Sequence, residues 1–142
     1  MNSTLQYIII DDDETNNMIS KYMLRQALGK ETDVVAFTSA REGIDFIASS
    51  YSELVRFRQI LFLDINMPEI NGWQTLELIN ELEPAIKNRL ITFMLSSSID
   101  PKDRKRASDH PLVYQFIEKP LTPEKLLSFG ANLEKNELSN HK

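Results

Sequence analysis

The chain of 142 residues has the length of one domain with a single hydrophobic core. Its net charge of −5 argues against a nucleic-acid backbone as the direct partner, because phosphate binding needs a basic patch. The absence of cysteine excludes disulfides, thiolate metal sites and a thiol nucleophile. No apolar run approaches the ~20 residues of a membrane span, and residues 1–6 are too short and polar for a signal peptide, so we expect a cytoplasmic protein without membrane insertion.

Five short, largely apolar runs predict strands buried on both faces of a sheet. They occupy residues 5–10, 33–37, 60–63, 90–95 and 113–117. After the first run, Met18, Ile19, Tyr22 and Met23 are spaced as one apolar face of a helix, which Gly29 is expected to end.

Start signals mark the other helices. Ser39 and Glu42 have the spacing of a capping box, and the pairs Asp100-Pro101 and Thr122-Pro123 each combine an N-cap residue with proline at the first helical position. Residues 73–82 show helical spacing that ends near Pro84. The segment 49–59 can be read either as a helix extension or as a loop.

A strand followed by a helix, repeated five times, predicts an α/β fold with a five-stranded parallel sheet and helices on both faces, a doubly wound (βα)5 arrangement. We expect a single domain over residues 1–142, with its core at about 5–133 and a polar tail at about 134–142. The carboxyl ends of parallel strands meet at one edge. The polar residues expected on that rim are Asp11, Asp12, Thr38, Ser39, Asp64, Ser96, Ser97 and Lys119.

The rim residues suit phosphoryl transfer when they are taken together. Clustered carboxylates fit a hard divalent cation such as Mg²⁺, and a carboxylate beside that metal can attack phosphorus. An ammonium group and a hydroxyl can neutralise the transferred phosphoryl oxygens. Each residue alone has a simpler role in a turn or a solvated loop, so the hypothesis depends on their joint position.

The same residues, in the same order, resemble the receiver domain of two-component response regulators, including the single-domain chemotaxis type. The resemblance extends from about Tyr7 to Leu133 and implies a flavodoxin-like fold. It rests on the acidic pair Asp11-Asp12, on Asp64 followed by Met67, Pro68 and Gly72, on Ser96 with Ser97, on Phe116, and on Lys119-Pro120 with the family's usual cis peptide.

The resemblance implies that Asp64 is the phosphoacceptor, which takes its phosphoryl group from the phosphohistidine of a sensor histidine kinase or a phosphotransfer protein. Asp12, Asp64 and the backbone carbonyl of Asn66 would ligate Mg²⁺. Asp11 would act mainly through a metal-bound water. The chain would be no conventional enzyme, since it would promote only its own phosphorylation and slow self-dephosphorylation.

The resemblance also implies how a signal would leave the site. Ser96 and Lys119 would contact the phosphoryl oxygens, and Ser96 and Phe116 would form a switch. The switch would change a protein-binding face over roughly residues 100–129, for a downstream protein target. Ser96 stands where the family more often has threonine and keeps the hydroxyl; Ser97 is larger than the usual alanine or glycine and would alter access to the site.

Other functions fit the residues less well. An aspartyl-phosphate phosphatase would need a second aspartate at position 66, which is asparagine. A calcium-binding loop starting at Asp11 would need glycine at position 16, which is also asparagine. The remaining alternative is a degenerate receiver that binds proteins without being phosphorylated.

Overall fold

The five strands form one parallel sheet in the computed structural model, which describes residues 5–50, 58–98 and 100–129. The strands are β1 (Leu5–Ile10), β2 (Val34–Phe37), β3 (Arg58–Asp64), β4 (Leu90–Ser96) and β5 (Val113–Glu118). The helices are α1 (Glu14–Leu28), α2 (Ala40–Ser49), α3 (Gly72–Asn80), the short α4 (Pro84–Lys87), α5 (Pro101–Asp109) and a further helix at residues 123–129.

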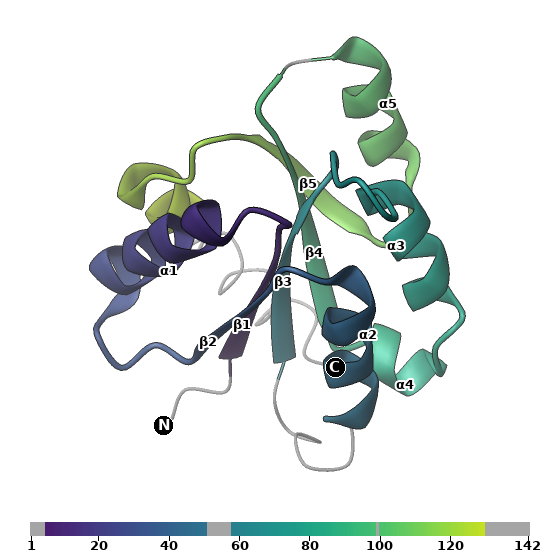
Figure 1. The fold of residues 1–142 in the computed structure, drawn as a ribbon, viewed down its shortest axis with the longest axis horizontal. Helices are drawn as coiled ribbons and strands as arrows, with labels where there is room; N and C mark the ends of the chain where they lie inside the picture. The colour runs from purple at the N-terminus through teal and green to yellow at the C-terminus, as the bar shows by residue number, and fades with distance from the viewer. Residues whose placement is uncertain (1–4, 51–57, 99, 130–142) are drawn as a thin grey trace.

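The strand order is β2-β1-β3-β4-β5, and every neighbouring pair runs parallel. α1 and the helix at 123–129 lie on one side of the sheet, and α2 to α5 lie on the other (Figure 1). The predicted doubly wound sheet is therefore confirmed. The direction of strand addition reverses between β1 and β3, which is where open α/β sheets bind their ligands.

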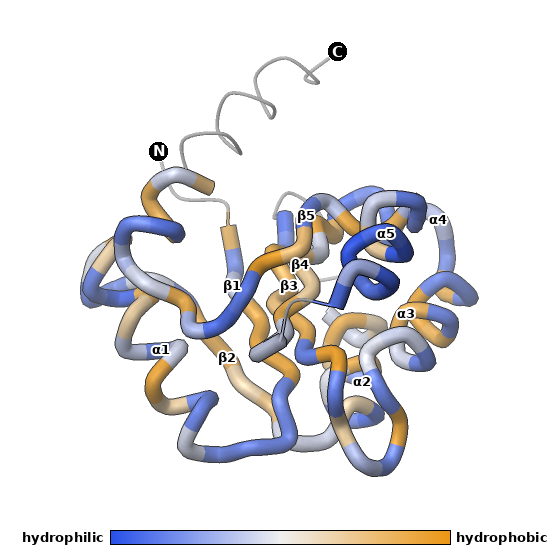
Figure 2. The backbone as a smooth tube through the Cα atoms, turned by 90° about the horizontal axis from the view of Figure 1, so that it is seen from above, coloured by the Kyte–Doolittle hydropathy of each residue, from blue (hydrophilic) through white to orange (hydrophobic). Residues whose placement is uncertain are grey.

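The strand β3 lies at the centre of the sheet and is apolar along most of its length because helices cover both of its faces. Ile60 and Phe62 point into one core cluster, and Leu61 and Leu63 point into the other; all four are at most 2% exposed. Figure 2 shows this concentration of hydrophobic residues along the strands, in contrast to the hydrophilic α5.

The predicted apolar face of α1 points mostly to solvent. Met18, Ile19 and Tyr22 are 67%, 45% and 60% exposed, and of the four predicted residues Met23 packs partly against the core. Asn17 and Leu24 are the buried residues of this helix. The Asn17 amide donates hydrogen bonds to two backbone carbonyls at the ends of β1 and β2, 3.0 and 3.4 Å away. A polar residue therefore takes an inward position, which a search for apolar spacing does not detect.

The predicted N-caps are present. The side chains of Ser39, Asp100 and Thr122 each accept a hydrogen bond from a backbone N–H in the first turn of their helix. The reciprocal capping box forms at α3, where Asn71 and Gln74 each accept a 2.8 Å hydrogen bond from the backbone N–H of the other. This capping box was not predicted from the sequence, because Asn71-Gly72 has the composition of a turn.

Other boundaries differ only slightly from the prediction. Pro84, expected to end a helix, is the first residue of α4, a position that proline favours. Residues 51–57, within the segment left open between helix and loop, and the expected tail lie outside the described residues. Within the described ranges, no helix has the length and apolar character needed to cross a membrane.

The helix α5 contacts the start of α3 through polar and aromatic groups. Ala107 is its one buried residue. Trp73, at the start of α3, donates a 3.3 Å hydrogen bond from Nε1 to Asp103, and the Arg106 guanidinium lies over its ring, 4.6 Å from the centroid. Trp73 therefore links α5 to the start of α3.

The start of α3 in turn packs against the end of β3. The Gly72 N–H donates a 2.8 Å hydrogen bond to the Ile65 carbonyl. A Cβ atom at position 72 would lie 2.7 Å from the carbonyl oxygen of Asp64 and 2.9 Å from the Cα of Ile65. Both of these are backbone atoms, so only glycine allows this close approach.

Replacing Gly72 with alanine should lower the free energy of unfolding by about 1–3 kcal/mol, the range for forcing a group into a packed region. Urea denaturation followed by circular dichroism measures the change. The control is Gln26→Ala on the exposed side of α1, where the expected change is within about 0.5 kcal/mol. If both variants unfold at the same urea concentration as the native chain, the close packing at Gly72 contributes nothing to stability.

Candidate functional site

Three carboxylates meet at the carboxyl edge of the sheet, between β1 and β3. Asp11 follows the last residue of β1, Asp12 comes next, and Asp64 is the last residue of β3. One carboxylate oxygen from each lies within 4.8 Å of the others. Asp11 and Asp64 are buried and Asp12 is exposed. The parallel pairing of β1 with β3 brings the three acids together, as expected from their positions after the strands.

Lys119 reaches this group from the end of β5. Its Nζ lies 2.9 Å from Oδ2 of Asp11 and 3.1 Å from Oδ1 of Asp64. Its side chain is 19% exposed, so these ion pairs are largely shielded from water. Two buried carboxylates side by side repel each other, and the shared ammonium group offsets that repulsion. The Lys119-Pro120 peptide bond is cis.

The environment affects the protonation of both partners. Burial raises the pKa of Asp64, the nearby Lys119 opposes that rise, the Asp11 charge adds to it, and the net result is a pKa above the usual value. Burial alone would lower the pKa of Lys119, but its hydrogen bonds to Asp11 and Asp64 and the charges of these residues raise it above its usual value. Lys119 therefore stays charged at neutral pH.

The acidic run at residues 11–14 has a different role at each position. Both carboxylate oxygens of Asp11 are engaged, because Oδ2 contacts Lys119 and Oδ1 accepts a 2.9 Å hydrogen bond from the Asp13 N–H. Asp13 is the N-cap of α1 and accepts from two backbone N–H groups of its first turn. This cap was not predicted, although an aspartate just before a helix is the usual sequence signal of an N-cap. Asp12 is the exposed member and faces solvent.

Asn66 follows β3 on a loop, and Ser96 ends the neighbouring strand β4. Asn66 is exposed, and its backbone hydrogen-bonds the Asp64 carboxylate. The predicted role of its carbonyl as a metal ligand stays a prediction. Ser96, the last residue of β4, is fully buried, and its Oγ accepts a 3.2 Å hydrogen bond from the Ser98 N–H. Its carbonyl accepts a 2.8 Å hydrogen bond from the Lys119 N–H, so the serine and the lysine are directly connected.

Phe116 is half-buried on β5. It packs against the core cluster on the α3 and α5 side of the sheet, and the guanidinium carbon of Arg104 lies 5.3 Å from the ring centroid. The predicted switch residue is therefore neither a fully buried core residue nor a free surface side chain. Arg104 was not identified from the sequence, because no local sequence pattern connects it with Phe116, twelve residues further along the chain.

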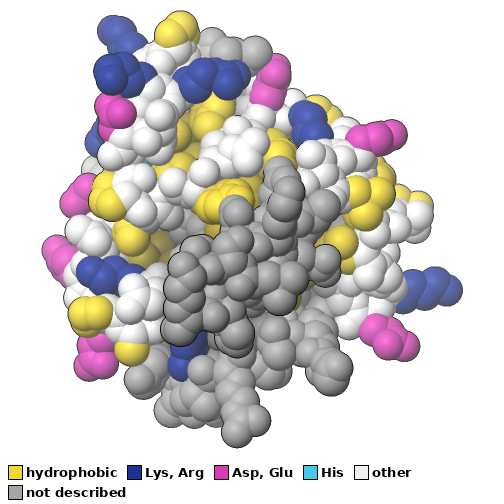
Figure 3. Space-filling model, turned by 180° about the vertical axis from the view of Figure 1, so that it is seen from behind, with side chains coloured by type: hydrophobic (Ala, Val, Ile, Leu, Met, Phe, Trp, Pro, Cys, Tyr) yellow, Lys and Arg dark blue, Asp and Glu magenta, His cyan; other side chains and the backbone are white. Residues whose placement is uncertain are grey.

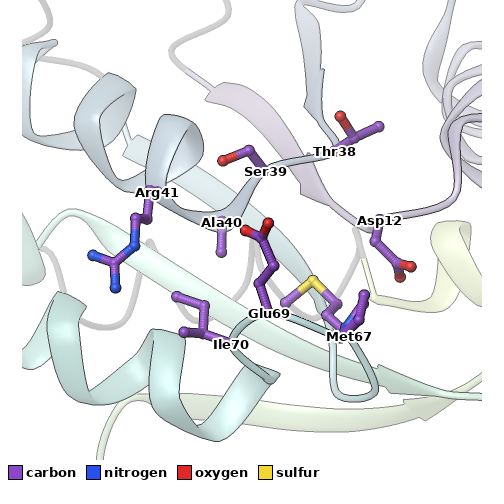
Figure 4. Close-up of a pocket in the computed structure, with 9 residues that line it drawn as sticks. Asp12, Thr38, Ser39, Ala40, Arg41, Met67, Glu69 and Ile70 are labelled. Atoms are coloured by element: carbon purple, nitrogen blue, oxygen red, sulfur yellow. The ribbon is translucent and has the colours of Figure 1, made fainter.

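A groove of about 360 Å³ opens next to Asp12. The loop after β2 and the start of α2 form one side, with Thr38, Ser39 and Arg41, and the β3–α3 loop forms the other, with Met67, Pro68, Glu69 and Ile70. Figure 4 shows Asp12 at one end of this groove. The exposed carboxylate of the acidic group can therefore be reached from solvent.

Known proteins resemble this chain in sequence and in overall fold. The family model described as "Response regulator receiver domain" matches residues 7–129. A crystal structure of a two-component response regulator from Cytophaga hutchinsonii is 29% identical, with a TM-score of 0.84, covering 94% of this chain and 99% of that one. A response regulator receiver protein from Dyadobacter fermentans is also 29% identical, with a TM-score of 0.80, covering 90% and 96%.

A more distant similarity concerns the fold alone. The chemotaxis protein CheY4 of Vibrio cholerae is 18% identical, with a TM-score of 0.70, and the match covers 92% of this chain and 98% of that one. No curated protein sequence matches the chain.

Proposed function

The chain belongs to the family of response regulator receiver domains, and from that premise we propose that Asp64 accepts a phosphoryl group from the phosphohistidine of a histidine kinase or a phosphotransfer protein. The observation that carries the proposal is the contact of Lys119 with both Asp64 and Asp11 beside the exposed Asp12. The proposed place of action is the cytoplasm.

In the proposed reaction, a carboxylate oxygen of Asp64 attacks phosphorus. The bond between phosphorus and the donor's imidazole nitrogen breaks, the imidazole leaves, and an acyl phosphate forms on Asp64. The attacking group must be ionised, and Lys119 together with the Asn66 backbone favours that form against the effect of burial. Lys119 also lies where it can neutralise charge on the transferred group. Beyond this transfer, the chain promotes only the slow hydrolysis of its own acyl phosphate, in which water takes up the phosphoryl group, inorganic phosphate leaves and the Asp64 carboxylate is restored.

The donor set fits Mg²⁺, because three carboxylates offer the hard oxygen ligands that this ion prefers and Asp12 leaves room for bound water. Asp12, Asp64 and the Asn66 carbonyl would hold the ion. The ion would supply positive charge beside the phosphoryl oxygens. Asp11 would act through water, since its own oxygens are already occupied by Lys119 and the Asp13 N–H.

Mg²⁺ should raise the melting temperature of the native chain, because it relieves carboxylate repulsion and binds the folded state alone. Asp12→Ala should lose most of that gain, since it removes the most accessible ligand. Differential scanning fluorimetry over a Mg²⁺ titration measures both effects. Asp45→Ala, which removes an exposed acid on α2, should keep the full gain. Equal gains in the Asp12 variant and the native chain would exclude Asp12 as a ligand.

Asp64→Asn should abolish phosphorylation, because the amide keeps the shape of the side chain but lacks the anionic nucleophile. Incubation with a small phosphodonor and Mg²⁺, followed by intact-mass spectrometry, should show one added phosphoryl group on the native chain and on the control Asp45→Asn. An adduct on the Asp64 variant would place the acceptor elsewhere. If neither a histidine kinase nor a small phosphodonor adds a phosphoryl group to the native chain, the alternative of a degenerate receiver that binds proteins without phosphorylation is favoured.

We further propose that Ser96 and Phe116 transmit the signal. A phosphoryl group on Asp64 adds negative charge and acceptor oxygens near the end of β4. The Ser96 hydroxyl can then turn away from the Ser98 N–H and donate to a phosphoryl oxygen. That movement would shift the loop after β4 and give the half-buried Phe116 ring a second packing position. Two packings close in free energy form an element that phosphorylation biases.

Amide NMR with a beryllofluoride phosphoryl mimic and Mg²⁺ tests the switch. In the native chain, changes in amide chemical shift should extend from the loops at Asp12 and Asp64 through Ser96 to Phe116 and α5. In Ser96→Ala, which lacks the hydroxyl, shifts near Asp12 and Asp64 should persist and those near Phe116 should largely disappear. Native shifts confined to the two loops at Asp12 and Asp64 would refute the proposed switch.

A further inference from the structure

The backbone around Lys119 is held by contacts on two sides. The Lys119 N–H donates a 2.8 Å hydrogen bond to the carbonyl of Ser96. The ammonium group of Lys125 donates to the carbonyl of Glu118 at 2.6 Å and to the carbonyl of Pro120 at 3.0 Å. These two carbonyls belong to the residues directly before and after Lys119. Because hydrogen bonds from a charged group are stronger than neutral ones, Lys125 fixes the short segment from which the Lys119 side chain starts.

Lys125 occupies a position where a positive charge is locally unfavourable. Thr122 is the N-cap of the helix at residues 123–129, since its Oγ1 accepts a 3.2 Å hydrogen bond from the Lys125 N–H. Lys125 is therefore the third residue of that helix. A capping box would place glutamate or glutamine there, and the partial positive charge of a helix N-terminus disfavours a cation. A residue that opposes the local preference needs a compensating contact elsewhere, and the two backbone carbonyls provide it.

The start of this helix is anchored in the core, so the contact of Lys125 has a fixed base. Leu121 and Leu126 are each 3% exposed and pack in the same core cluster as Ile117. Several basic side chains project into solvent in Figure 3. The Lys125 side chain is instead half-buried and turns back to its own chain. Ordering a long side chain costs conformational entropy, which the two hydrogen bonds offset.

We infer that Lys125 is a positioning residue for phosphoryl acceptance, which holds the backbone of Lys119 so that the Lys119 ammonium group reaches both buried carboxylates. The Lys119 Nζ lies 2.9 Å from Asp11 and 3.1 Å from Asp64 at the same time. Such an arrangement tolerates little displacement, because reacting groups have to be held to within about 0.5 Å of the productive geometry. The inference rests on the proposed function and names a residue outside the acidic site on which the rate of that reaction depends.

Lys125→Met tests the inference, because methionine keeps an unbranched apolar side chain but has no N–H donor. Intact-mass spectrometry over time, with a small phosphodonor and Mg²⁺, measures the rate of phosphorylation. The variant should react about tenfold more slowly than the native chain, since a 1 Å displacement of a positioned group can cost about 100-fold. Lys125→Arg keeps the N–H donors and should recover most of the rate. A loss in the arginine variant as large as that in the methionine variant would overturn the inference.

Lys87→Met is the matched control. The Lys87 ammonium group also donates to a backbone carbonyl, that of Asn80 at 2.9 Å, but Lys87 lies on α4, on the opposite side of the sheet from Lys125. The two substitutions make the same change in charge and remove the same kind of contact. The Lys87 variant should be phosphorylated at the native rate. Equal slowing in the two variants would indicate a general loss of stability and overturn the inference.

Amide hydrogen exchange followed by NMR reports the hold on Lys119 without any phosphorylation. The Lys119 N–H is bonded to the Ser96 carbonyl in the folded chain, and local opening of that contact allows exchange with water. Its exchange rate should rise about fivefold or more in Lys125→Met and stay at the native value in Lys87→Met. An unchanged exchange rate in Lys125→Met would overturn the inference, whatever its rate of phosphorylation.

The outcomes separate this inference from the proposed function. If the native chain takes up no phosphoryl group from any donor, the proposed function is wrong and the inference is overturned with it. If the native chain is phosphorylated and Lys125→Met reacts at the same rate, the role of Lys125 alone is overturned. Slower phosphorylation and faster exchange at Lys119, both confined to the Lys125→Met variant, are the expected result.

Discussion

The shared ion pair of Lys119 with Asp11 and Asp64 is the interaction on which the site depends. It joins the ends of three strands, because Asp11 follows β1, Asp64 ends β3, and Lys119 follows β5. Without the ammonium group, two buried carboxylates would face each other with no positive charge between them. The contact therefore permits a buried, ionised carboxylate at Asp64 and also connects the central strands to β5, the strand that carries Phe116.

The placement of those acids depends on a polar contact at the opposite end of the sheet. The Gln59 side chain donates hydrogen bonds to Gln6, at 2.9 Å, and to Ser50, at 3.0 Å, and all three are buried. Gln6 and Gln59 are also register partners between β1 and β3. A shift of one residue would leave buried amides unpaired and turn apolar side chains to the wrong face. The same register places Asp11 and Asp64 side by side.

The sequence predicted the strands, their parallel arrangement and the rim, because apolar runs and parallel topology together determine where strand ends meet. It did not predict the rotation of α1, since helical spacing shows that an apolar face exists and not that it turns inward, as Met18 and Tyr22 demonstrate. The contact of Arg104 with Phe116 was also not predicted from the sequence. That contact depends on how α5 lies against β5, a tertiary arrangement that no local pattern encodes.

The position of Trp73 makes this chain its own spectroscopic sensor. It is the single tryptophan of the sequence, its indole N–H is bonded to Asp103, and its ring lies beneath Arg106. The preceding residue, Gly72, packs against the backbone of Asp64. The indole thus stands between the end of β3 and α5, and any displacement of α5 must change the charges and the hydrogen bond around it. Its ultraviolet emission follows that displacement without a label.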